Sequence, residues 1–215
     1  MRQFVEAGLY LVTSQSLSAG RSTEAIVAAA LRGGVRLIQL REKELPLRDY
    51  VRLAENVRRM TREAGALLII NDRVDVALGV DADGVHLGQD DFPVGEARNL
   101  GPDLIIGAST HSPAEAHAAQ AAGASYINIG PLFPTRTKAW SGAFLGWEGL
   151  RAVQAAAAIP FTVMGGIKRE HIPGLVQSGV RTIALVTAVT AAPDPEQAAR
   201  DLLTEIRECR GGAGR

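Results

Sequence analysis

Residues 104–130, LIIGASTHSPAEAHAAQAAGASYINIG, contain one complete copy of the pattern that decides the fold. The short aliphatic run Leu104–Ala108 is followed by an alanine-rich helical stretch, Pro113–Ala122, whose proline falls where the first turn of a helix tolerates it. Gly123 comes where such a helix stops, and a second apolar run, Tyr126–Gly130, follows. Both runs are short and apolar on both faces, which is typical of a buried parallel sheet. The stretch therefore predicts a strand–helix–strand unit.

The same alternation recurs along the whole chain. The expected strands are Leu9–Thr13, Leu37–Arg41, Leu67–Asn71, Gly84–Leu87, Leu104–Ala108, Tyr126–Gly130, Phe161–Met164 and Thr182–Val186. The expected helices are Ser22–Arg32, Leu47–Ala64, Val74–Leu78, Val94–Leu100, Pro113–Ala122, Trp147–Ala157, Arg169–Ser178 and Pro195–Cys209. Eight such units in about 200–250 residues match a (β/α)₈ (TIM) barrel. A doubly wound open sheet is the alternative, but this sequence has no GxGxxG motif after its first strand. We expect an α/β protein with one barrel domain over residues 1–210 and a disordered tail at 211–215.

Composition excludes several classes of function. Lys and Arg number 23, as do Asp and Glu, so the formal net charge is zero and there is no basic surface for nucleic acid or membrane. The single cysteine, Cys209, excludes a disulfide framework and a cysteine-based zinc site. No apolar run approaches the roughly 18 residues of a membrane helix, and Glu6 precedes any stretch that resembles a secretory signal. We expect a protein of the reducing cytoplasm, and a homo-oligomer is left open.

Polar residues follow nearly every expected strand, where a barrel carries its chemistry. At the end of the second strand, Gln39, Arg41 and Lys43 alternate with other residues. The two-residue period of a strand places their side chains on one face, towards the barrel axis. Two cations aimed into a barrel mouth require an anion to compensate for their desolvation. Solvated charges that face outward are the alternative.

Two carboxylates end neighbouring strands, Asp72 after the third and Asp91 after the fourth. Beside a cationic anion site they indicate Mg²⁺, which takes one or two protein carboxylates and fills its octahedron with water and phosphate oxygens. Asp72 could instead cap the next helix. Asp90 competes with Asp91 for the metal, and spacing alone does not decide between them.

The long segment after the sixth strand, Leu132–Gly146, predicts a functional loop. Its hydroxyl and ammonium groups suit a phosphate ligand, and they belong to Thr135, Thr137 and Lys138.

A second phosphate site is expected on the last two strands. Gly165 and Gly166 follow the seventh strand, and Val186 and Thr187 end the eighth, where barrels of this class commonly hold a phosphomonoester on backbone N–H groups. Two phosphate sites in one barrel mouth predict an enzyme that joins two phosphorylated small molecules, one of which carries a metal-bound leaving group.

The strand-end sequences resemble those of the thiamine phosphate synthase family from Leu9 to Thr187. The motifs are QLREK at 39–43, ND at 71–72, HLGQDD at 86–91, GPLFPTRTK at 130–138 and GGI at 165–167. The resemblance implies that 4-amino-2-methyl-5-(diphosphooxymethyl)pyrimidine couples to a thiazole ethyl phosphate, carboxylated or not, to give thiamine phosphate and diphosphate.

The resemblance also implies a role for each matching residue. The pyrimidine diphosphate would be bound by Gln39, Leu40, Arg41, Glu42, Lys43, Asn71, Ser109 and Lys138, of which Arg41, Lys43, Ser109 and Lys138 would be catalytic. The thiazole phosphate would be bound by Thr135, Arg136, Thr137, Gly166, Val186 and Thr187. One Mg²⁺ ion would be bound by Asp72 and Asp91, so that the resemblance, and not the spacing, selects Asp91 over Asp90.

Two other functions are weighed beside this one. A thiazole tautomerase-like relative on the same barrel would use a base such as His111 and would not need the diphosphate machinery. A non-catalytic barrel that binds a phosphorylated ligand would have lost ligand residues, and none is visibly lost.

Overall fold

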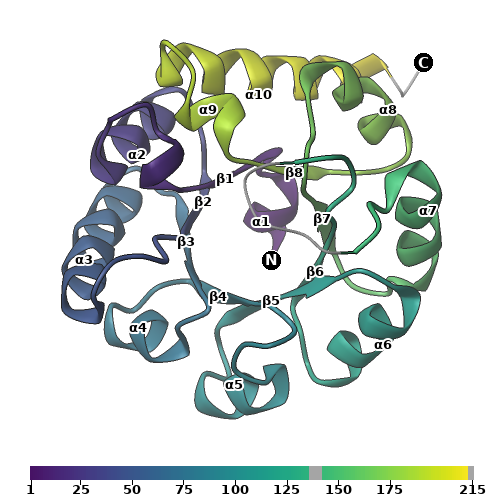
Figure 1. Ribbon diagram of the computed structural model, residues 1–215, viewed down its shortest axis with the longest axis horizontal. Coiled ribbons are helices and arrows are strands. Elements are labelled where there is room, and N and C mark those ends of the chain that lie inside the picture. The colour runs from purple at the N-terminus through teal and green to yellow at the C-terminus, as the bar shows by residue number, and fades with distance from the viewer. Residues whose placement is uncertain (136–141, 213–215) are drawn as a thin grey trace.

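A computed structural model describes residues 1–135 and 142–212. Eight parallel strands form a closed ring, and helices surround it (Figure 1). The strands are β1 (Leu9–Val12), β2 (Leu37–Leu40), β3 (Leu67–Asn71), β4 (Gly84–Leu87), β5 (Ile105–Thr110), β6 (Tyr126–Ile129), β7 (Phe161–Val163) and β8 (Thr182–Leu185). Because β1 pairs with both β2 and β8, the sheet is closed. The expected (β/α)₈ barrel is confirmed, and the open-sheet alternative is wrong.

Helices follow the strands in the expected order. They are α1 (Arg2–Glu6), α2 (Thr23–Arg32), α3 (Leu47–Glu63), α4 (Val74–Gly79), α5 (Val94–Leu100), α6 (Pro113–Ala121), α7 (Gly146–Ala156), α8 (Ile172–Gln177), α9 (Thr187–Thr190) and α10 (Pro195–Gly212), with 3₁₀ turns at Gln15–Leu17 and Arg169–His171. The side chain of Ser22 accepts a hydrogen bond from the backbone N–H of Ala25, which caps α2. No helix in the described part of the chain is long and apolar enough to cross a membrane.

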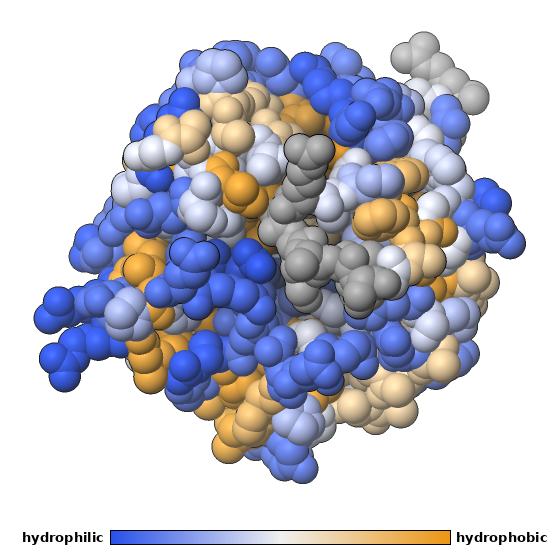
Figure 2. All heavy atoms as spheres, viewed as in Figure 1, coloured by the Kyte–Doolittle hydropathy of each residue, from blue (hydrophilic) through white to orange (hydrophobic). Residues whose placement is uncertain are grey.

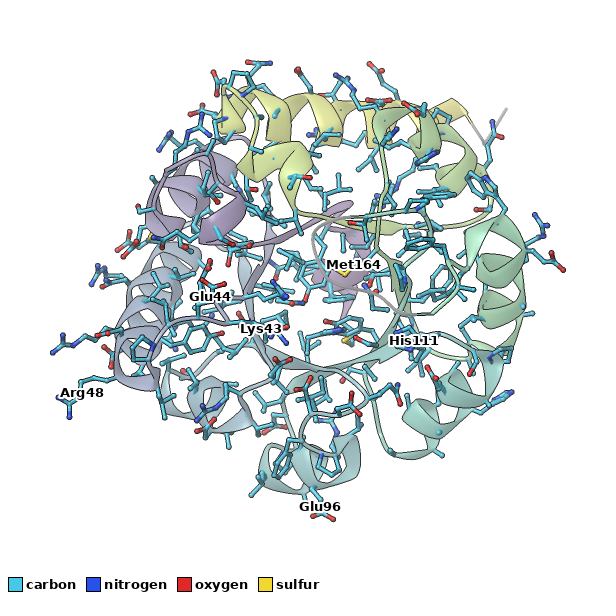
Figure 3. The ribbon with its side chains drawn as sticks, in the orientation of Figure 1. Lys43, Glu44, Arg48, Glu96, His111 and Met164 are labelled. Atoms are coloured by element: carbon cyan, nitrogen blue, oxygen red, sulfur yellow. The ribbon has the colours of Figure 1, made fainter. Side chains whose placement is uncertain are left out.

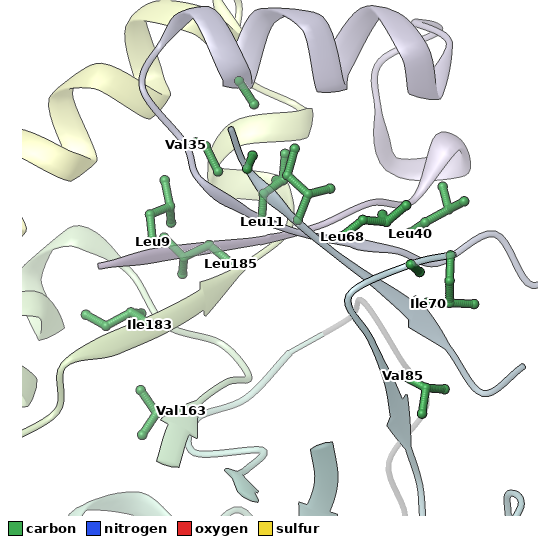
Figure 4. Close-up of a cluster of buried hydrophobic side chains, with 14 of the residues drawn as sticks. Leu9, Leu11, Val35, Leu40, Leu68, Ile70, Val85, Val163, Ile183 and Leu185 are labelled. Carbon is green, nitrogen blue, oxygen red and sulfur yellow. The ribbon is translucent and has the colours of Figure 1, made fainter. Parts of the chain in front are cut away.

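The strand residues alternate between two separate cores. On β1, Leu9 and Leu11 face the helices and join the outer core, part of which is shown in Figure 4. Tyr10 and Val12, on the opposite face of the same strand, join the cluster that fills the barrel interior. Burial on both faces explains why the strands read as continuous apolar runs in the sequence.

The N-terminal helix α1 was not expected from the sequence. Five residues are too few to show a helical period, yet Phe4 is buried and packs its ring against Tyr10 and Tyr126, with ring centroids 5.9 and 4.2 Å away. Figure 1 shows α1 at the centre of the ring, behind the strands. This helix therefore closes the barrel at the end opposite the carboxyl ends of the strands.

Other differences from the expected elements are small. Strand β5 extends two residues beyond the expected Ala108 because Ser109 pairs with Asn128 of β6, so its polar side chain does not end the strand. The other strands begin at the expected residue and end within one residue of the expected position. The short helix α9 was not expected, since its four residues follow β8 directly. Helix α10 continues to Gly212, which takes in two residues of the expected tail, and 213–215 lie outside the described residues.

Gly107 of β5 faces Tyr126 of β6 inside the barrel. A Cβ atom at Gly107 would lie 2.1 Å from Cζ of Tyr126 and 2.5 Å from Nδ1 of His86. Only a hydrogen atom fits between these rings, so the absence of a side chain at Gly107 leaves the space that the tyrosine occupies.

We predict that Gly107→Ala lowers the free energy of unfolding by about 1–3 kcal/mol or more, because overpacking a close-packed core forces strained positions. Gly95→Ala is the control: its Cβ would have no neighbour nearer than 3.9 Å, and a helical alanine is neutral to about 1 kcal/mol stabilising. Urea unfolding of both variants measures the difference. Equal stability of the two variants would contradict the packing described.

Candidate active site

The carboxyl ends of the strands surround a cavity with about 1200 Å³ of empty space, its open mouth included. Hydrophilic side chains gather on this face of the molecule (Figure 2). Figure 3 shows Lys43 and Met164 within the ring of strands, whereas Arg48 and Glu96 point away from it. The expected residues that line the cavity are Gln39, Arg41, Lys43, Asn71, Asp72, Asp91, Ser109, Thr135, Gly166, Val186 and Thr187.

One side of the cavity combines a cation with two carboxylates. Nζ of Lys43 lies 3.1 Å from Oδ2 of Asp72, and Oδ2 of Asp91 accepts a hydrogen bond of 2.7 Å from the backbone N–H of Gly88. Burial and the neighbouring Asp91 carboxylate raise the pKa of Asp72, although Lys43 acts in the opposite direction. The two carboxylates interact closely enough that either a shared proton or a bound cation stabilises the pair.

Asp72 owes its position to an unusual backbone conformation. Its φ angle is +62°, a left-handed value that aspartate tolerates better than most residues, and its N–H donates to the carbonyl of His86. Helix α4 begins after Arg73 without a side-chain cap. The alternative role of Asp72 as a helix cap is therefore wrong, and its carboxylate is left facing the cavity.

The structure also separates the two aspartates after β4. Asp91 is half-buried and lines the cavity, whereas Asp90 is exposed and does not. With Asp72, the side chain of Asp91 forms the donor set that a hard divalent cation prefers, with open positions for water and phosphate oxygens. The residues present fit Mg²⁺.

Not every residue of the QLREK motif turns its side chain to the cavity. Gln39, Arg41 and Lys43 do, as the two-residue period predicted. Leu40 is buried in the outer core, and the carboxylate of Glu42 accepts hydrogen bonds from the backbone N–H of Gln15 and the hydroxyl of Thr23. The side chains of Leu40 and Glu42 therefore lie outside the cavity lining, because strand alternation places them on the opposite face.

The floor of the cavity is a chain of buried polar groups. Nε2 of Gln39 donates to the hydroxyl of Tyr10 at 2.8 Å, and the Tyr10 and Tyr126 hydroxyls are 2.9 Å apart. The Tyr126 hydroxyl lies 2.9 Å from Nδ1 of His86, and Nε2 of His86 lies 3.0 Å from Oγ of Ser109. The chain thus connects two expected ligand residues, one on β2 and one on β5, across the barrel.

The opposite side of the cavity is built from backbone. Gly166 has a φ angle of +63°, and a Cβ atom there would lie 2.4 Å from the carbonyl oxygen of Pro134, so this close approach of two loops requires glycine. Among the described residues, the N–H groups of Gly166, Thr187 and Ala188 have no hydrogen-bond acceptor. Three free donors on one wall make an environment for an anion.

Part of the expected site cannot be placed. Arg136, Thr137 and Lys138 lie outside the described residues, so their predicted roles stay predictions.

Several cavity-lining side chains had no role in the predicted synthase site, among them His86, His111, Asn128 and Met164. The two-residue period was a usable signal for Asn128, because it lies two positions before Gly130 at the end of β6. Nδ1 of His111 lies 2.8 Å from Oε2 of Glu115, in the first turn of α6. His111 also lines the cavity, just before helix α6. This is the residue that the tautomerase alternative would use as a base.

Comparisons with known proteins agree on one family. The thiamine monophosphate synthase family matches residues 9–189. A thiamine-phosphate synthase of Moorella thermoacetica is 44% identical over 204 residues, which cover 94% of this chain and 97% of that protein. One from Chlorobium luteolum is 50% identical over 190 residues, covering 88% and 90%. Among solved structures, thiamine phosphate pyrophosphorylase from Pyrococcus furiosus superposes with a TM-score of 0.87 at 38% identity, over 95% of this chain and 97% of that one.

We predict that Asp91→Asn lowers the pKa of Asp72 in metal-free protein, because the variant removes the like charge that raises this pKa while burial remains. A raised native pKa means that the folded state keeps a proton that the unfolded state has lost. Stability therefore falls as pH rises from the unfolded to the native pKa, and Asp91→Asn should narrow that window. Carboxyl ¹³C NMR titration measures the shift. Asp90→Asn is the control and should change nothing, and an unshifted Asp72 in Asp91→Asn would show that the carboxylates do not interact.

Proposed function

Because the chain belongs to the thiamine monophosphate synthase family, we propose that it joins 4-amino-2-methyl-5-(diphosphooxymethyl)pyrimidine to a thiazole ethyl phosphate, releasing diphosphate. Membership makes the chain a transferase of thiamine biosynthesis, which sets aside the non-catalytic barrel. The identity of the two substrates, the Mg²⁺ dependence and the cytoplasmic location are our proposals.

The observation that carries the substrate assignment is the asymmetry of the cavity. One wall holds Arg41, Lys43 and the Asp72–Asp91 pair, which suits a highly charged diphosphate together with a divalent cation. The other wall offers the N–H groups of Gly166 and Thr187, which have no acceptor among the described residues and suit a phosphomonoester. A cavity that recognises two different phosphate groups fits a reaction between two phosphorylated molecules.

The cationic wall is proposed to stabilise the departing diphosphate, and the reaction needs no nucleophile from the protein. The bond between the pyrimidylmethyl carbon and the diphosphate oxygen breaks, and its electron pair leaves with the diphosphate. Arg41 and Lys43, with Lys138 from the undescribed segment, stabilise the charge that develops there, which is electrostatic catalysis by groups already in position. Mg²⁺ held by Asp72 and Asp91 would supply further positive charge to the same oxygens.

The pyrimidine ring is proposed to lie on the floor of the cavity. Gln39, Asn71 and Ser109 line that part and offer amide and hydroxyl groups to its nitrogen atoms. The electron-rich aminopyrimidine can stabilise the cation that remains when diphosphate leaves. The thiazole nitrogen then forms the new carbon–nitrogen bond, with its phosphate held by Gly166, Val186 and Thr187 on the opposite wall, together with Thr135, Arg136 and Thr137.

A turnover assay tests the proposed function. The purified protein is mixed with the pyrimidine diphosphate, Mg²⁺ and either the carboxylated or the uncarboxylated thiazole phosphate, and released diphosphate and thiamine phosphate are measured. We expect equal amounts of both products with at least one thiazole. Absence of thiamine phosphate with both thiazoles would contradict the proposal.

We predict that Asp91→Asn raises the Mg²⁺ concentration for half-maximal turnover at least tenfold, since a single remaining carboxylate holds a water-rich ion weakly. Asp90→Asn should leave the Mg²⁺ requirement unchanged, because this neighbour is exposed and outside the cavity lining. The measurement is a Mg²⁺ titration of initial rates for both variants. If Asp90→Asn is the damaging substitution, the assignment after β4 is wrong.

A further inference from the structure

The buried chain from Gln39 to Ser109 has a direction as well as a path. Its members are buried: Tyr10 and Tyr126 are 0% exposed, while Gln39 and His86, which border the cavity, are 3% and 7% exposed. Groups buried this completely must satisfy their hydrogen bonds with one another. Their protons can therefore be assigned by counting.

The count starts at Gln39, whose amide nitrogen can only donate. Because that nitrogen donates to the Tyr10 hydroxyl, the proton of Tyr10 is directed to its other partner, the oxygen of Tyr126. The Tyr126 proton is then directed to Nδ1 of His86.

An acceptor at Nδ1 determines the form of the imidazole. His86 is then neutral, with its proton on Nε2, and it donates to Oγ of Ser109. Because Oγ of Ser109 accepts this hydrogen bond from His86, the hydroxyl proton of Ser109 points into the cavity that it lines. At the other end, Oε1 of Gln39 has no donor among the described residues, so it remains an acceptor for a ligand.

The count requires that both phenols keep their protons, and burial ensures this. It raises the pKa of Tyr10 and of Tyr126 well above the ordinary value of a phenol. Both hydroxyls therefore stay protonated at neutral pH.

We propose that the chain Gln39–Tyr10–Tyr126–His86–Ser109 fixes a hydrogen-bond acceptor at Gln39 and a donor at Ser109, and thereby selects an aminopyrimidine over its oxo analogue. The inference rests on the proposed function in that the pyrimidine occupies this floor. An aminopyrimidine offers an N–H donor on its amino group and an acceptor on its ring nitrogen, which complement the two ends of the chain. An oxo-pyrimidine reverses both, and it would leave buried polar groups unpaired.

Tyr10, Tyr126 and His86 are therefore positioning residues. Tyr10 and Tyr126 lie outside the cavity lining and act on the ligand only through Gln39 and Ser109, whereas His86 also borders the cavity. The role assigned to all three is to fix the direction of the hydrogen bonds. If the amide of Gln39 were turned over, every proton in the chain would reverse. His86 would then carry its proton on Nδ1, and Ser109 would be an acceptor. The two states of the chain predict opposite ligands and opposite histidine tautomers.

The first test reads the tautomer directly in the protein without substrates. In ¹⁵N-histidine NMR, with His86→Gln used to assign the signal, we expect His86 to carry its proton on Nε2. Gln39→Glu has no N–H to offer Tyr10, so its carboxylate should accept from Tyr10 and move the His86 proton to Nδ1. A wild-type His86 protonated on Nδ1, or on both nitrogens, would overturn the proposal, as would a tautomer that does not respond to Gln39→Glu.

The second test measures selection of the pyrimidine. We expect Tyr126→Phe to reduce the ratio of kcat/KM for the amino substrate to kcat/KM for the oxo analogue at least tenfold. Without the Tyr126 hydroxyl, the Tyr10 proton can be accepted only by Oε1 of Gln39, which requires the amide to turn. Gln39 then no longer presents a fixed acceptor to the ligand. An unchanged ratio would overturn the proposal even if both rates fell.

A matched control separates polarity from lost stability. Tyr50→Phe also removes a buried phenol hydroxyl, which donates to the carbonyl of Leu40 at 2.8 Å, but Tyr50 lies outside the chain and the cavity lining. It should leave both the amino-to-oxo ratio and the His86 tautomer unchanged. The NMR test needs no turnover, so failure of the proposed function and failure of this inference give different results.

Discussion

The hydrogen bond between the hydroxyls of Tyr10 and Tyr126 is the contact on which the interior of this barrel depends. It spans the axis at 2.9 Å and joins residues 116 positions apart in the sequence. Below it the tyrosine rings pack on Phe4, and above it the polar groups of Gln39 and His86 begin. One pair of side chains therefore closes the apolar end of the barrel and forms the polar floor of the cavity, and the absence of a side chain at Gly107 is what leaves room for it.

Much of this arrangement could be predicted from the sequence, because the repeat of strands and helices reflects burial on both strand faces. The two-residue period correctly placed Gln39, Arg41 and Lys43 on one face, and strand adjacency brought Asp72 and Asp91 together. These are local properties of a strand and of its neighbour, which a single sequence contains.

The rest depends on contacts that no local pattern records. Helix α1 has one buried side chain, Phe4, and most of its docking site is formed by β6 and β8, far along the chain. No local pattern marks the role of His86, because its partners, Tyr126 and Ser109, are 40 and 23 positions away. The left-handed backbone of Asp72, which turns the carboxylate to the cavity, also had no signal, since aspartate there reads equally well as a helix cap.

The docking of α1 also bears on the order in which the chain can assemble. The hydroxyl of Thr182 on β8 donates to the backbone carbonyls of Phe4 and Val5, a separation of 178 and 177 residues. During synthesis the first helix leaves the ribosome early, but its partners on β6 and β8 are made much later. The contacts of Phe4 with Tyr126 and Thr182 therefore cannot form until β6 and β8 have been made, when the ring of strands is nearly complete. Residues 2–6 are therefore made before most of the barrel and are among the last to reach their native contacts.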